Sequence, residues 1–153
     1  MERTLVLLKP DAVQRRLVGR IVARFEDKGL CVVGMKLIRM SEQLAGQMYL
    51  PHKGKDFFEP LMAFMTSGPT IAMALEGRDA IAVVRLLMGR TFGREAAPGT
   101  VRGDFGMSMR HNLVHSSDAP EAAERETPLF FSEDELVRWT PADGPWVYED
   151  WKG

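Results

Sequence analysis

The order in which strand-like and helix-like segments alternate constrains the fold of this chain more than any other feature. Apolar runs or alternations typical of strands occur at residues 4–8, 33–37, 71–75 and 109–115. Apolar residues recur at helical spacing at 13–25 and 79–88, and shorter helices are expected at 42–49 and 57–65. The order contains a βαββαβ unit. We therefore expect an α/β fold (an α+β sandwich) of the ferredoxin-like type, with helices covering one face of a four-stranded antiparallel sheet.

Local signals refine this order. Gly29 and Gly89 follow the two longer helical patterns, in the position that helix C-terminal caps favour. In the second strand Val33, Met35 and Leu37 alternate with polar or small residues, which predicts one buried face. Residues 116–120 have the hydroxyl, carboxylate and early proline typical of a helix start.

The 153 residues predict a single domain, 1–153, because the sequence has no internal repeat and no low-complexity tract. Its last part, from about 127 to 153, is an aromatic and acidic C-terminal extension. This extension holds Phe130, Phe131, Trp139, Trp146 and Trp151. Side chains of this size need burial, so we expect the extension to pack on the domain or on a neighbouring subunit.

The charge is unevenly distributed along the chain. Residues 1–117 carry 17 Lys and Arg against 11 Asp and Glu, whereas residues 118–153 carry 3 against 10. The basic surplus of the first part is modest and forms no dense Lys/Arg block, which argues against a protein that coats nucleic acid regardless of sequence. A small anionic substrate is compatible with this distribution.

The sequence favours a cytoplasmic protein without a membrane role. The single Cys31 excludes an intramolecular disulfide, which is consistent with a reducing compartment. The first residues lack the positive-then-apolar order of a signal peptide. The longest charge-free run, residues 60–75, is interrupted by Gly68-Pro69 and is shorter than the roughly 20 apolar residues of a membrane-spanning helix.

A long loop at 89–106 is the first candidate for a functional segment. It contains five glycines together with Arg90, Arg94 and Arg102. Glycine lets the backbone approach a ligand closely, and the guanidinium fork matches phosphate oxygens. The loop contains neither a Walker P-loop nor a dinucleotide-binding fingerprint, so by itself it is equally consistent with an ordinary solvated loop.

His115 is the most informative of the three histidines, because it ends a predicted strand just before a predicted helix start. Unpaired helix N–H groups there would favour an anion such as phosphate. On spacing alone, an ordinary hydrogen-bonded histidine at a strand end is the more common outcome. His111 and His115 provide no third ligand for a metal, and Cys31 between Leu30 and Val32 suits a small buried side chain. The adjacent Phe57 and Phe58 are either core residues or, if exposed, a platform for a base.

Taken together, the motifs resemble those of the nucleoside diphosphate kinase family, nearly from end to end. The matching motifs are Glu2-Arg3-Thr4, Lys9-Pro10-Asp11-Ala12-Val13, Gly19, Arg24-Phe25-Glu26, Tyr49 with His52, Phe57-Phe58, Ser67-Gly68-Pro69, Glu76-Gly77, Arg85, Gly89 with Thr91, residues 98–105 and Asn112-Leu113-Val114-His115. The family's phosphoryl-carrying histidine falls on His115, which outweighs the strand-end interpretation.

This resemblance implies a ping-pong reaction. A nucleoside triphosphate, typically ATP, gives its γ-phosphoryl group to His115, and a nucleoside diphosphate then collects it, which maintains NTP and dNTP pools with broad base and sugar tolerance. By position, the resemblance assigns the support of the histidine to Tyr49, Glu126 and Ser117. It assigns nucleotide binding to Lys9 and Asn112 (ribose), to Arg85, Thr91 and Arg102 (phosphates, with His52), and to Phe57 (base, with Met109 opposite).

The resemblance also implies Mg²⁺ as the cofactor, held chiefly by the nucleotide phosphates without a direct protein ligand. Members of the family are usually hexamers and sometimes tetramers, so we expect a homo-oligomer. The chain departs from the family pattern at Ser116, where a glycine is usual, and at Asp56 and Gly93, where prolines are common. It departs again at residues 127–131. These changes bear on rate and stability, because none removes a chemical group.

Two other classes of function stay open on the residues. A catalytically silent nucleotide-binding module of the same fold would be recognised by loss of His115, Lys9 or Arg102, all of which are present. A nucleic-acid-binding domain would share the ferredoxin-like sheet. The predicted strands, however, lack a ribonucleoprotein-type aromatic motif, so no specific nucleic acid is expected as a partner.

Overall fold

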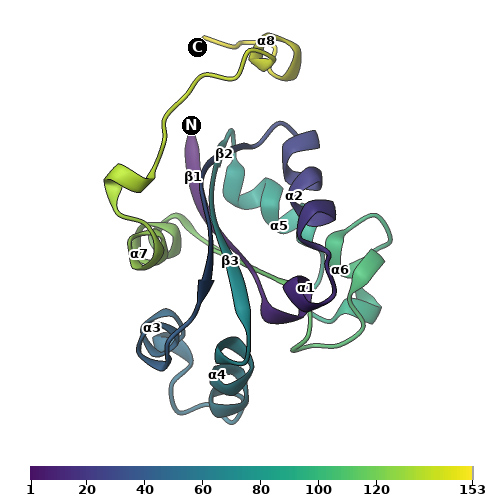
Figure 1. Cartoon of the computed structure of the whole chain (residues 1–153). Helices are drawn as coiled ribbons and strands as arrows, with labels where there is room; N and C mark the ends of the chain where they lie inside the picture. The colour runs from purple at the N-terminus through teal and green to yellow at the C-terminus, as the bar shows by residue number, and fades with distance from the viewer. Residues whose placement is uncertain (153) are drawn as a thin grey trace.

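A computed structural model describes residues 1–152 of the chain. Its sheet has four antiparallel strands in the order β2-β3-β1-β4. The strands are β1 (Glu2–Leu8), β2 (Cys31–Arg39), β3 (Pro69–Gly77) and β4 (Val114–Ser116). The two central strands β1 and β3 cross the middle of the molecule in Figure 1. The predicted four-stranded antiparallel sheet is therefore confirmed.

Helices cover both faces of this sheet, so the prediction that they cover one face is wrong. The helices are α1 (Pro10–Gln14), α2 (Val18–Asp27), α3 (Glu42–Met48), α4 (Phe58–Thr66), α5 (Ala80–Met88), α6 (Val101–Phe105), α7 (Pro120–Phe130) and α8 (Gly144–Val147), with short 3₁₀ turns at Leu50–His52, Gly93–Glu95 and Glu133–Glu135. In Figure 1 α2 and α5 lie on one side of the strands, and α3 and α7 lie on the other. The uninterrupted apolar run of β1 in the sequence indicates a strand that is covered on both faces, and Leu5 to Leu8 are all fully buried.

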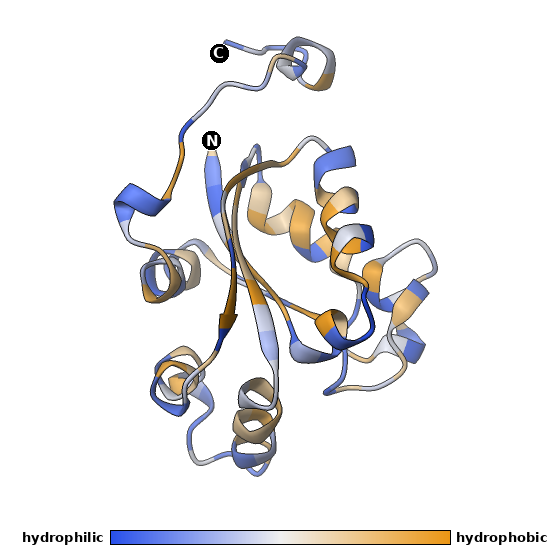
Figure 2. Ribbon diagram, viewed as in Figure 1, coloured by the Kyte–Doolittle hydropathy of each residue, from blue (hydrophilic) through white to orange (hydrophobic). Residues whose placement is uncertain are grey.

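Two hydrophobic cores result, one on each side of the sheet (Figure 2). The first packs Val6 and Leu8 of β1 against α2 and α5, where Ile21, Phe25 and Val84 are buried. The second packs Leu5 and Leu7 against α3, α4 and α7, with Met48, Met65 and Phe130. β1 therefore contributes alternate side chains to the two cores. Packing on both faces of the sheet fixes the end of β1, from which Lys9 continues.

The outer half of β2 contradicts its predicted buried face. A β-bulge shifts the pairing with β3 between Val32 and Gly34. Beyond the bulge, Met35 and Leu37 are 45% and 63% exposed. The alternation is real, but it places both side chains on a part of this edge strand that no element of the described chain covers.

The predicted helix 13–25 is divided into α1 and α2. Arg16 between them adopts the left-handed conformation with φ 58°, which ends one helix before the next begins. The apolar spacing was informative only from Val18 onward. Gly29 follows α2 with φ 91°, in agreement with its predicted role as a helix terminator.

Residues 89–116 differ from the prediction in two ways: the predicted loop contains a helix, and the predicted strand is shorter. The glycine-rich loop contains α6, whose N-cap is Thr100: its hydroxyl accepts a hydrogen bond from the Gly103 amide at 3.0 Å. The predicted strand 109–115 is reduced to β4. Leu113 has φ 74°, and its amide donates to the Asp11 carboxylate instead of to a neighbouring strand. A side-chain contact therefore replaces one backbone hydrogen bond of the strand ladder just before β4.

The C-terminal segment after α7 runs along β2 and the end of α2. The Val137 amide donates to the carbonyl of Val33, and the Trp139 indole donates to the carbonyl of Val32. Further on, the Tyr148 hydroxyl donates to the carbonyl of Gly29. Although Phe130 and Phe131 are buried, Trp146 is 90% exposed. Part of the aromatic extension is thus packed on the rest of the chain, and part of it is left uncovered.

Candidate active site

One cavity of about 620 Å³ brings together nearly all the predicted site residues. It opens where β1 and β4 end, between α3, α5 and the segment 88–112. Its lining includes Lys9, Tyr49, His52, Phe57, Arg85, Thr91, Arg102, Met109, Asn112, His115 and Glu126. Of the predicted residues only Ser117 does not line it; Ser117 is fully buried and contacts the cavity through Glu126.

His115 lies in the middle of the three-residue strand β4, opposite Leu7 of β1. Its Nε2 atom lies 3.2 Å from Oε2 of Glu126, which comes from α7. A carboxylate at this distance favours a proton on Nε2, which leaves the lone pair on Nδ1. The ring of Tyr49 meets the imidazole edge-on, with centroids 5.9 Å apart. The histidine is therefore held on two sides and presents a nucleophilic nitrogen.

Glu126 is the hub of this arrangement. The same Oε2 atom accepts a hydrogen bond from the Ser117 hydroxyl at 2.8 Å, and Oε1 accepts one from Arg125 at 2.9 Å. Burial raises the pKa of Glu126, but the hydrogen bonds from His115 and Ser117 and the charge of Arg125 outweigh burial and leave the pKa below its ordinary value. Glu126 is thus kept as a carboxylate beside the imidazole.

Lys9 reaches the cavity from the first residue after β1. It caps α1, and its ammonium donates to the Asn112 side-chain oxygen at 2.7 Å. The amide nitrogen of Asn112 in turn donates to the Thr91 carbonyl at 2.8 Å. This chain of contacts joins β1, the loop after α5 and the segment before β4. One of three ammonium donors is used, so two N–H groups of Lys9 remain for a ligand.

Arg102 is buried against the backbone. Its guanidinium donates to the carbonyl oxygens of Asn112, Gly89 and Val114 at 3.2, 3.1 and 2.7 Å. Three of its five N–H donors are therefore engaged with the polypeptide. Arg102 holds the irregular segment before His115 in place, a role that sequence patterns did not reveal, and it keeps two donors free.

Buried positive charge dominates the electrostatics of the cavity. Burial, and then the charge of Arg102, lower the pKa of Lys9 to about 8 in spite of the nearby Asp11 carboxylate. Burial, and then the charge of Arg85, lower the pKa of Arg102 to about 10. Cations whose charge is disfavoured in this way gain from an anion placed between them. The cavity is therefore suited to a multiply charged anionic ligand.

Aromatic and apolar side chains form the outer part of the cavity. Phe57 is 45% exposed, and its ring centroid lies 5.3 Å from that of His52. Met109 is 62% exposed and lines the same cavity. The alternative in which Phe57 is a core residue is excluded by this exposure. A half-exposed aromatic ring next to an apolar side chain is a surface on which a planar base can stack.

Three charged residues of the cavity were missed by sequence reasoning: Arg110, Asp118 and Arg125. Only Arg125 has a defined contact, its hydrogen bond to Glu126. Its position in the sequence pointed to the site, because Arg125 directly precedes Glu126, which the family resemblance assigns to the support of His115. Nothing in the local pattern distinguished Arg110 or Asp118 from ordinary surface charges.

The departures from the family pattern have distinct structural settings. Ser116 has no positive φ, so the backbone beside His115 accommodates a side chain, but its hydroxyl is buried without a hydrogen-bond partner. Gly93 lies against Gly106, and a Cβ atom on Gly93 would lie 2.7 Å from the Met107 amide nitrogen. A side chain at 93 therefore does not fit this loop. Asp56 is exposed.

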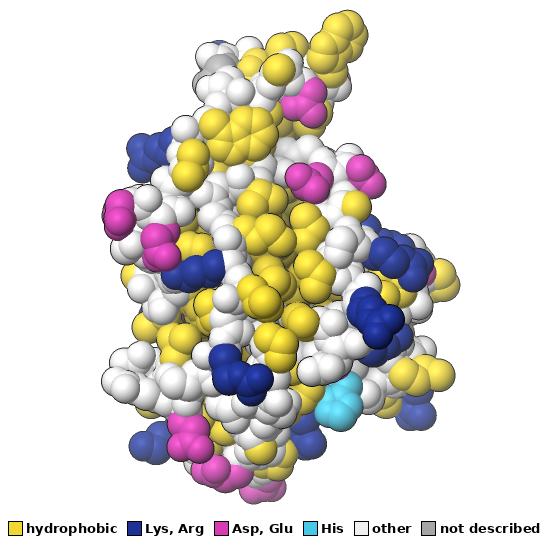
Figure 3. Space-filling model, viewed as in Figure 1, with side chains coloured by type: hydrophobic (Ala, Val, Ile, Leu, Met, Phe, Trp, Pro, Cys, Tyr) yellow, Lys and Arg dark blue, Asp and Glu magenta, His cyan; other side chains and the backbone are white. Residues whose placement is uncertain are grey.

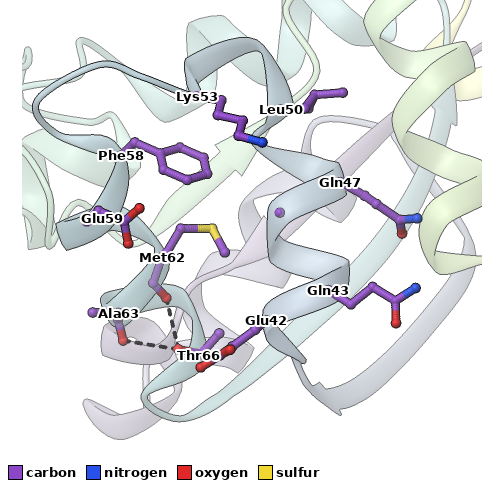
Figure 4. A pocket seen from close by; sticks show the side chains of 11 residues that line it. Glu42, Gln43, Gln47, Leu50, Lys53, Phe58, Glu59, Met62, Ala63 and Thr66 are labelled. Atoms are coloured by element: carbon purple, nitrogen blue, oxygen red, sulfur yellow. Dashed lines mark hydrogen bonds between the residues drawn. The ribbon is translucent and has the colours of Figure 1, made fainter.

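A second cavity, of about 630 Å³, lies between α3 and α4 (Figure 4). Met62 on α4 points toward α3 across it, and Lys53 stands at one end. None of the predicted site residues lines it. Residues 1–152 contain no group of three or more His, Cys, Asp or Glu side chains that could hold a metal ion. The cavity around His115 is therefore the candidate active site.

Comparisons with known proteins agree with this geometry. The sequence model described as nucleoside diphosphate kinase matches residues 2–136. The chain is 53% identical over 150 residues to the nucleoside diphosphate kinase of Archaeoglobus fulgidus, covering 98% of this chain and 99% of that protein. It is 55% identical over 148 residues to that of Bacillus licheniformis, covering 97% and 100%.

Solved structures extend the comparison to three dimensions. A nucleoside diphosphate kinase from Halobacterium salinarum in complex with CDP superposes with a TM-score of 0.94 at 53% identity, covering 96% of this chain and 98% of that one. A family protein from Babesia bovis superposes with a TM-score of 0.93 at 44% identity, covering 97% and 100%. With the sequence match and the arrangement around His115, these similarities establish that the chain belongs to the nucleoside diphosphate kinase family.

Proposed function

We propose that this enzyme transfers the γ-phosphoryl group of a nucleoside triphosphate, typically ATP, to a nucleoside diphosphate through a phosphohistidine on His115. The observation that carries the proposal is the contact between His115 Nε2 and Glu126 inside a cavity walled by cations. It supplies an imidazole with one nitrogen held by a carboxylate, in a cavity suited to polyphosphate. Family membership makes the chain a phosphotransferase.

In the first half-reaction Nδ1 of His115 attacks the γ-phosphorus. The N–P bond forms as the bond to the bridging oxygen breaks, and the nucleoside diphosphate leaves with that oxygen. Glu126 holds the Nε2 proton and stabilises the positive charge that develops on the ring. The second half-reaction runs in reverse with another diphosphate. Because both bonds exchanged are phosphoanhydrides, nucleotide concentrations set the direction.

The remaining residues position the nucleotide. Arg102 is buried with N–H donors to spare, and Arg85 and Thr91 line the same cavity, so these three are assigned to the phosphates. Lys9 donates a hydrogen bond to Asn112, and we assign both residues to the ribose hydroxyls. Phe57 is assigned to the base. Stacking is worth roughly 1 to 3 kcal/mol per base and depends little on base identity, which supports the use of nucleotides with different bases.

The carboxylates that line the cavity fit a Mg²⁺ ion bound by the nucleotide phosphates better than one bound by the protein. Glu126 is occupied by His115, Ser117 and Arg125. The other acidic residue of the lining, Asp118, is exposed. We therefore assign the ion to the phosphate oxygens, with no direct protein ligand. Bound there, Mg²⁺ would neutralise phosphate charge during the transfer.

Incubation with γ-labelled ATP and Mg²⁺, without any acceptor, tests the proposal. We expect an acid-labile phosphate on His115, and added diphosphates of different bases should remove it. His115→Ala should take up no label, whereas His111→Ala, which changes an exposed histidine outside the cavity lining, should take up label as the parent does. A parent protein that takes up no label would contradict the proposal, and so would full transfer activity in His115→Ala.

We also propose a homo-oligomer, a hexamer or a tetramer, that works in the cytoplasm as one catalytic domain spanning 1–153. Support for self-association comes from the uncovered apolar side chains of β2 and the C-terminal segment, including Leu37 and Trp146. Support for the location comes from the unpaired thiol of Cys31. Among residues 1–152, no helix has both the length and the apolar character required to cross a membrane.

A further inference from the structure

The position of Met109 gives the proposed nucleotide site an oxidisable side chain. Five of the ten methionines are buried in the two cores: Met40, Met48, Met65, Met73 and Met88. Among the described residues four are largely exposed: Met1, Met35, Met107 and Met109. Of these four only Met109 also lines the cavity around His115. One thioether is therefore open to solvent and in contact with the ligand space at once.

We propose that Met109 is a site of reversible oxidation that controls how tightly the enzyme binds nucleotides. The proposal rests on the proposed function of the cavity. Its co-reactant is a peroxide such as hydrogen peroxide. The thioether sulfur attacks one peroxide oxygen, the O–O bond breaks, and a sulfoxide and water result. The sulfur loses two electrons, and the peroxide gains them.

Oxidation changes the chemistry of the outer part of the cavity. A methionine side chain is flexible, apolar and polarisable, whereas its sulfoxide is polar and carries a strong hydrogen-bond acceptor. Phe57, half-exposed in the same lining, remains as it was. The base would then stack between one aromatic ring and one solvated group. We expect the KM for nucleotide to rise about five-fold, a part of the stacking contribution of a base.

The chemical step is shielded from this change. His115, Glu126 and Ser117 form a hydrogen-bonded unit, and the side chains of His115 and Glu126 are only 24% and 6% exposed. The turnover number should therefore change little while KM changes. This split distinguishes a base-binding effect from general oxidative damage, which would lower the turnover number.

The competing target for peroxide is Cys31 on β2. Burial raises the pKa of its thiol, and the charges of Asp143 and Glu76 raise it further, so little of the reactive thiolate is present at neutral pH. Cys31 also does not line the cavity. Met107 provides the matched control, because it is 75% exposed and two residues from Met109 but absent from the cavity lining.

The test treats the full-length enzyme with hydrogen peroxide and maps oxidised methionines by peptide mass spectrometry. KM, turnover number and the Kd for ADP are measured before and after treatment. In the parent and in Met107→Ile we expect Met109 sulfoxide and a rise of about five-fold in KM and Kd. In Met109→Ile the ratio of treated to untreated KM should stay near one. Methionine sulfoxide reductase, supplied with a dithiol as reductant, should convert the sulfoxide back to the thioether and restore the KM of the parent.

Two results would overturn the inference: an unchanged Kd for ADP in protein whose Met109 is oxidised, or the same loss of affinity in Met109→Ile as in the parent. Failure of the proposed function has a different signature. Untreated enzyme would then transfer no phosphoryl group, and the Kd for ADP would still report whether oxidation of Met109 affects binding.

Discussion

At the scale of single residues, the charge of Lys9 links nucleotide binding to pH. Its pKa is lowered from 10.5 to about 8, first by burial and then by Arg102. Between these two values the unfolded chain binds a proton that the folded chain has lost, so the contribution of Lys9 to the free energy of unfolding increases as pH rises through this window. An anionic ligand acts in the opposite direction, because it favours the charged form.

We therefore predict that nucleotide binding near pH 8 takes up protons through Lys9. The Kd for ADP should increase as pH rises above about 8, by no more than ten-fold per pH unit for a single group. Calorimetry in two buffers of different ionisation enthalpy measures the uptake. Lys9→Arg keeps its charge throughout this range and should lose the uptake. Equal proton uptake in the parent and the variant would assign it to another group.

The adjacent serines beside the nucleophile offer a second prediction. Ser116 and Ser117 are both buried, but only Ser117 has a hydrogen-bond partner, the carboxylate of Glu126. Ser116→Ala removes an unsatisfied hydroxyl and should raise the free energy of unfolding by about 1 kcal/mol. Ser117→Ala should lower it by a similar amount and slow phosphorylation of His115. Urea unfolding compares the two. A destabilised Ser116→Ala would mean that its hydroxyl has a partner after all.

At the scale of secondary-structure elements, sequence patterns predicted what depends on local periodicity and missed what depends on distant contacts. The helices α3, α4 and α5 and the strands β1 and β3 lie close to their predicted positions. The face of β2 could not be predicted, because its exposure is decided by what covers an edge strand. The part of the predicted strand 109–115 that precedes β4 is irregular, because Asp11 and Lys9, about a hundred residues away, bind the Leu113 amide and the Asn112 side chain.

The candidate site shows the same division. The family resemblance named His115 and its partners by position, and all of them except Ser117 line the cavity. The three hydrogen bonds from Arg102 to carbonyl groups were not predictable, because an arginine in a glycine-rich loop is as often exposed to solvent. Arg110 and Asp118 were not predictable either, because only the three-dimensional course of the chain brings them to the cavity.

The loop element between α5 and β4 leads to a prediction on Gly93. A Cβ atom there would overlap the backbone of Gly106 and Met107, which cannot move aside as a side chain can. Gly93→Ala should therefore lower the free energy of unfolding by about 1 to 3 kcal/mol and raise the KM for nucleotide, because Thr91 and Arg102 flank this contact.

Gly19 provides the matched control for this substitution. It lies in α2 with nothing within 4 Å of a Cβ atom, so Gly19→Ala should stabilise the enzyme by about 0.5 to 1 kcal/mol through helix propensity and leave KM unchanged. Thermal unfolding and steady-state kinetics on both variants decide the matter. A Gly93→Ala enzyme as stable as the parent would show that the loop repacks without cost.

At the scale of the whole molecule, charge and apolar surface are placed in different regions. The basic surplus of residues 1–117 includes the buried cations of the cavity, Lys9 and Arg102. The acidic C-terminal segment runs instead along β2 and the end of α2, where the indole of Trp139 is bound to a carbonyl group of β2. In Figure 3 hydrophobic side chains gather over the middle of the visible face, with basic side chains on either side. A surface of this kind is typical of a face that is covered in an assembly.

A substitution at Leu37 tests whether the uncovered part of β2 is an interface between subunits. It is 63% exposed on an edge strand, and Met35 beside it on the same face is 45% exposed. Leu37→Asp places a charge where a neighbouring subunit would exclude water, so sedimentation velocity at micromolar concentration should show a shift from an oligomer toward a single chain. Leu86→Asp is the control, because Leu86 is 71% exposed on α5, and its variant should sediment like the parent. If the parent itself sediments as a single chain, or if Leu37→Asp keeps the parent's mass, this face of β2 is not an interface.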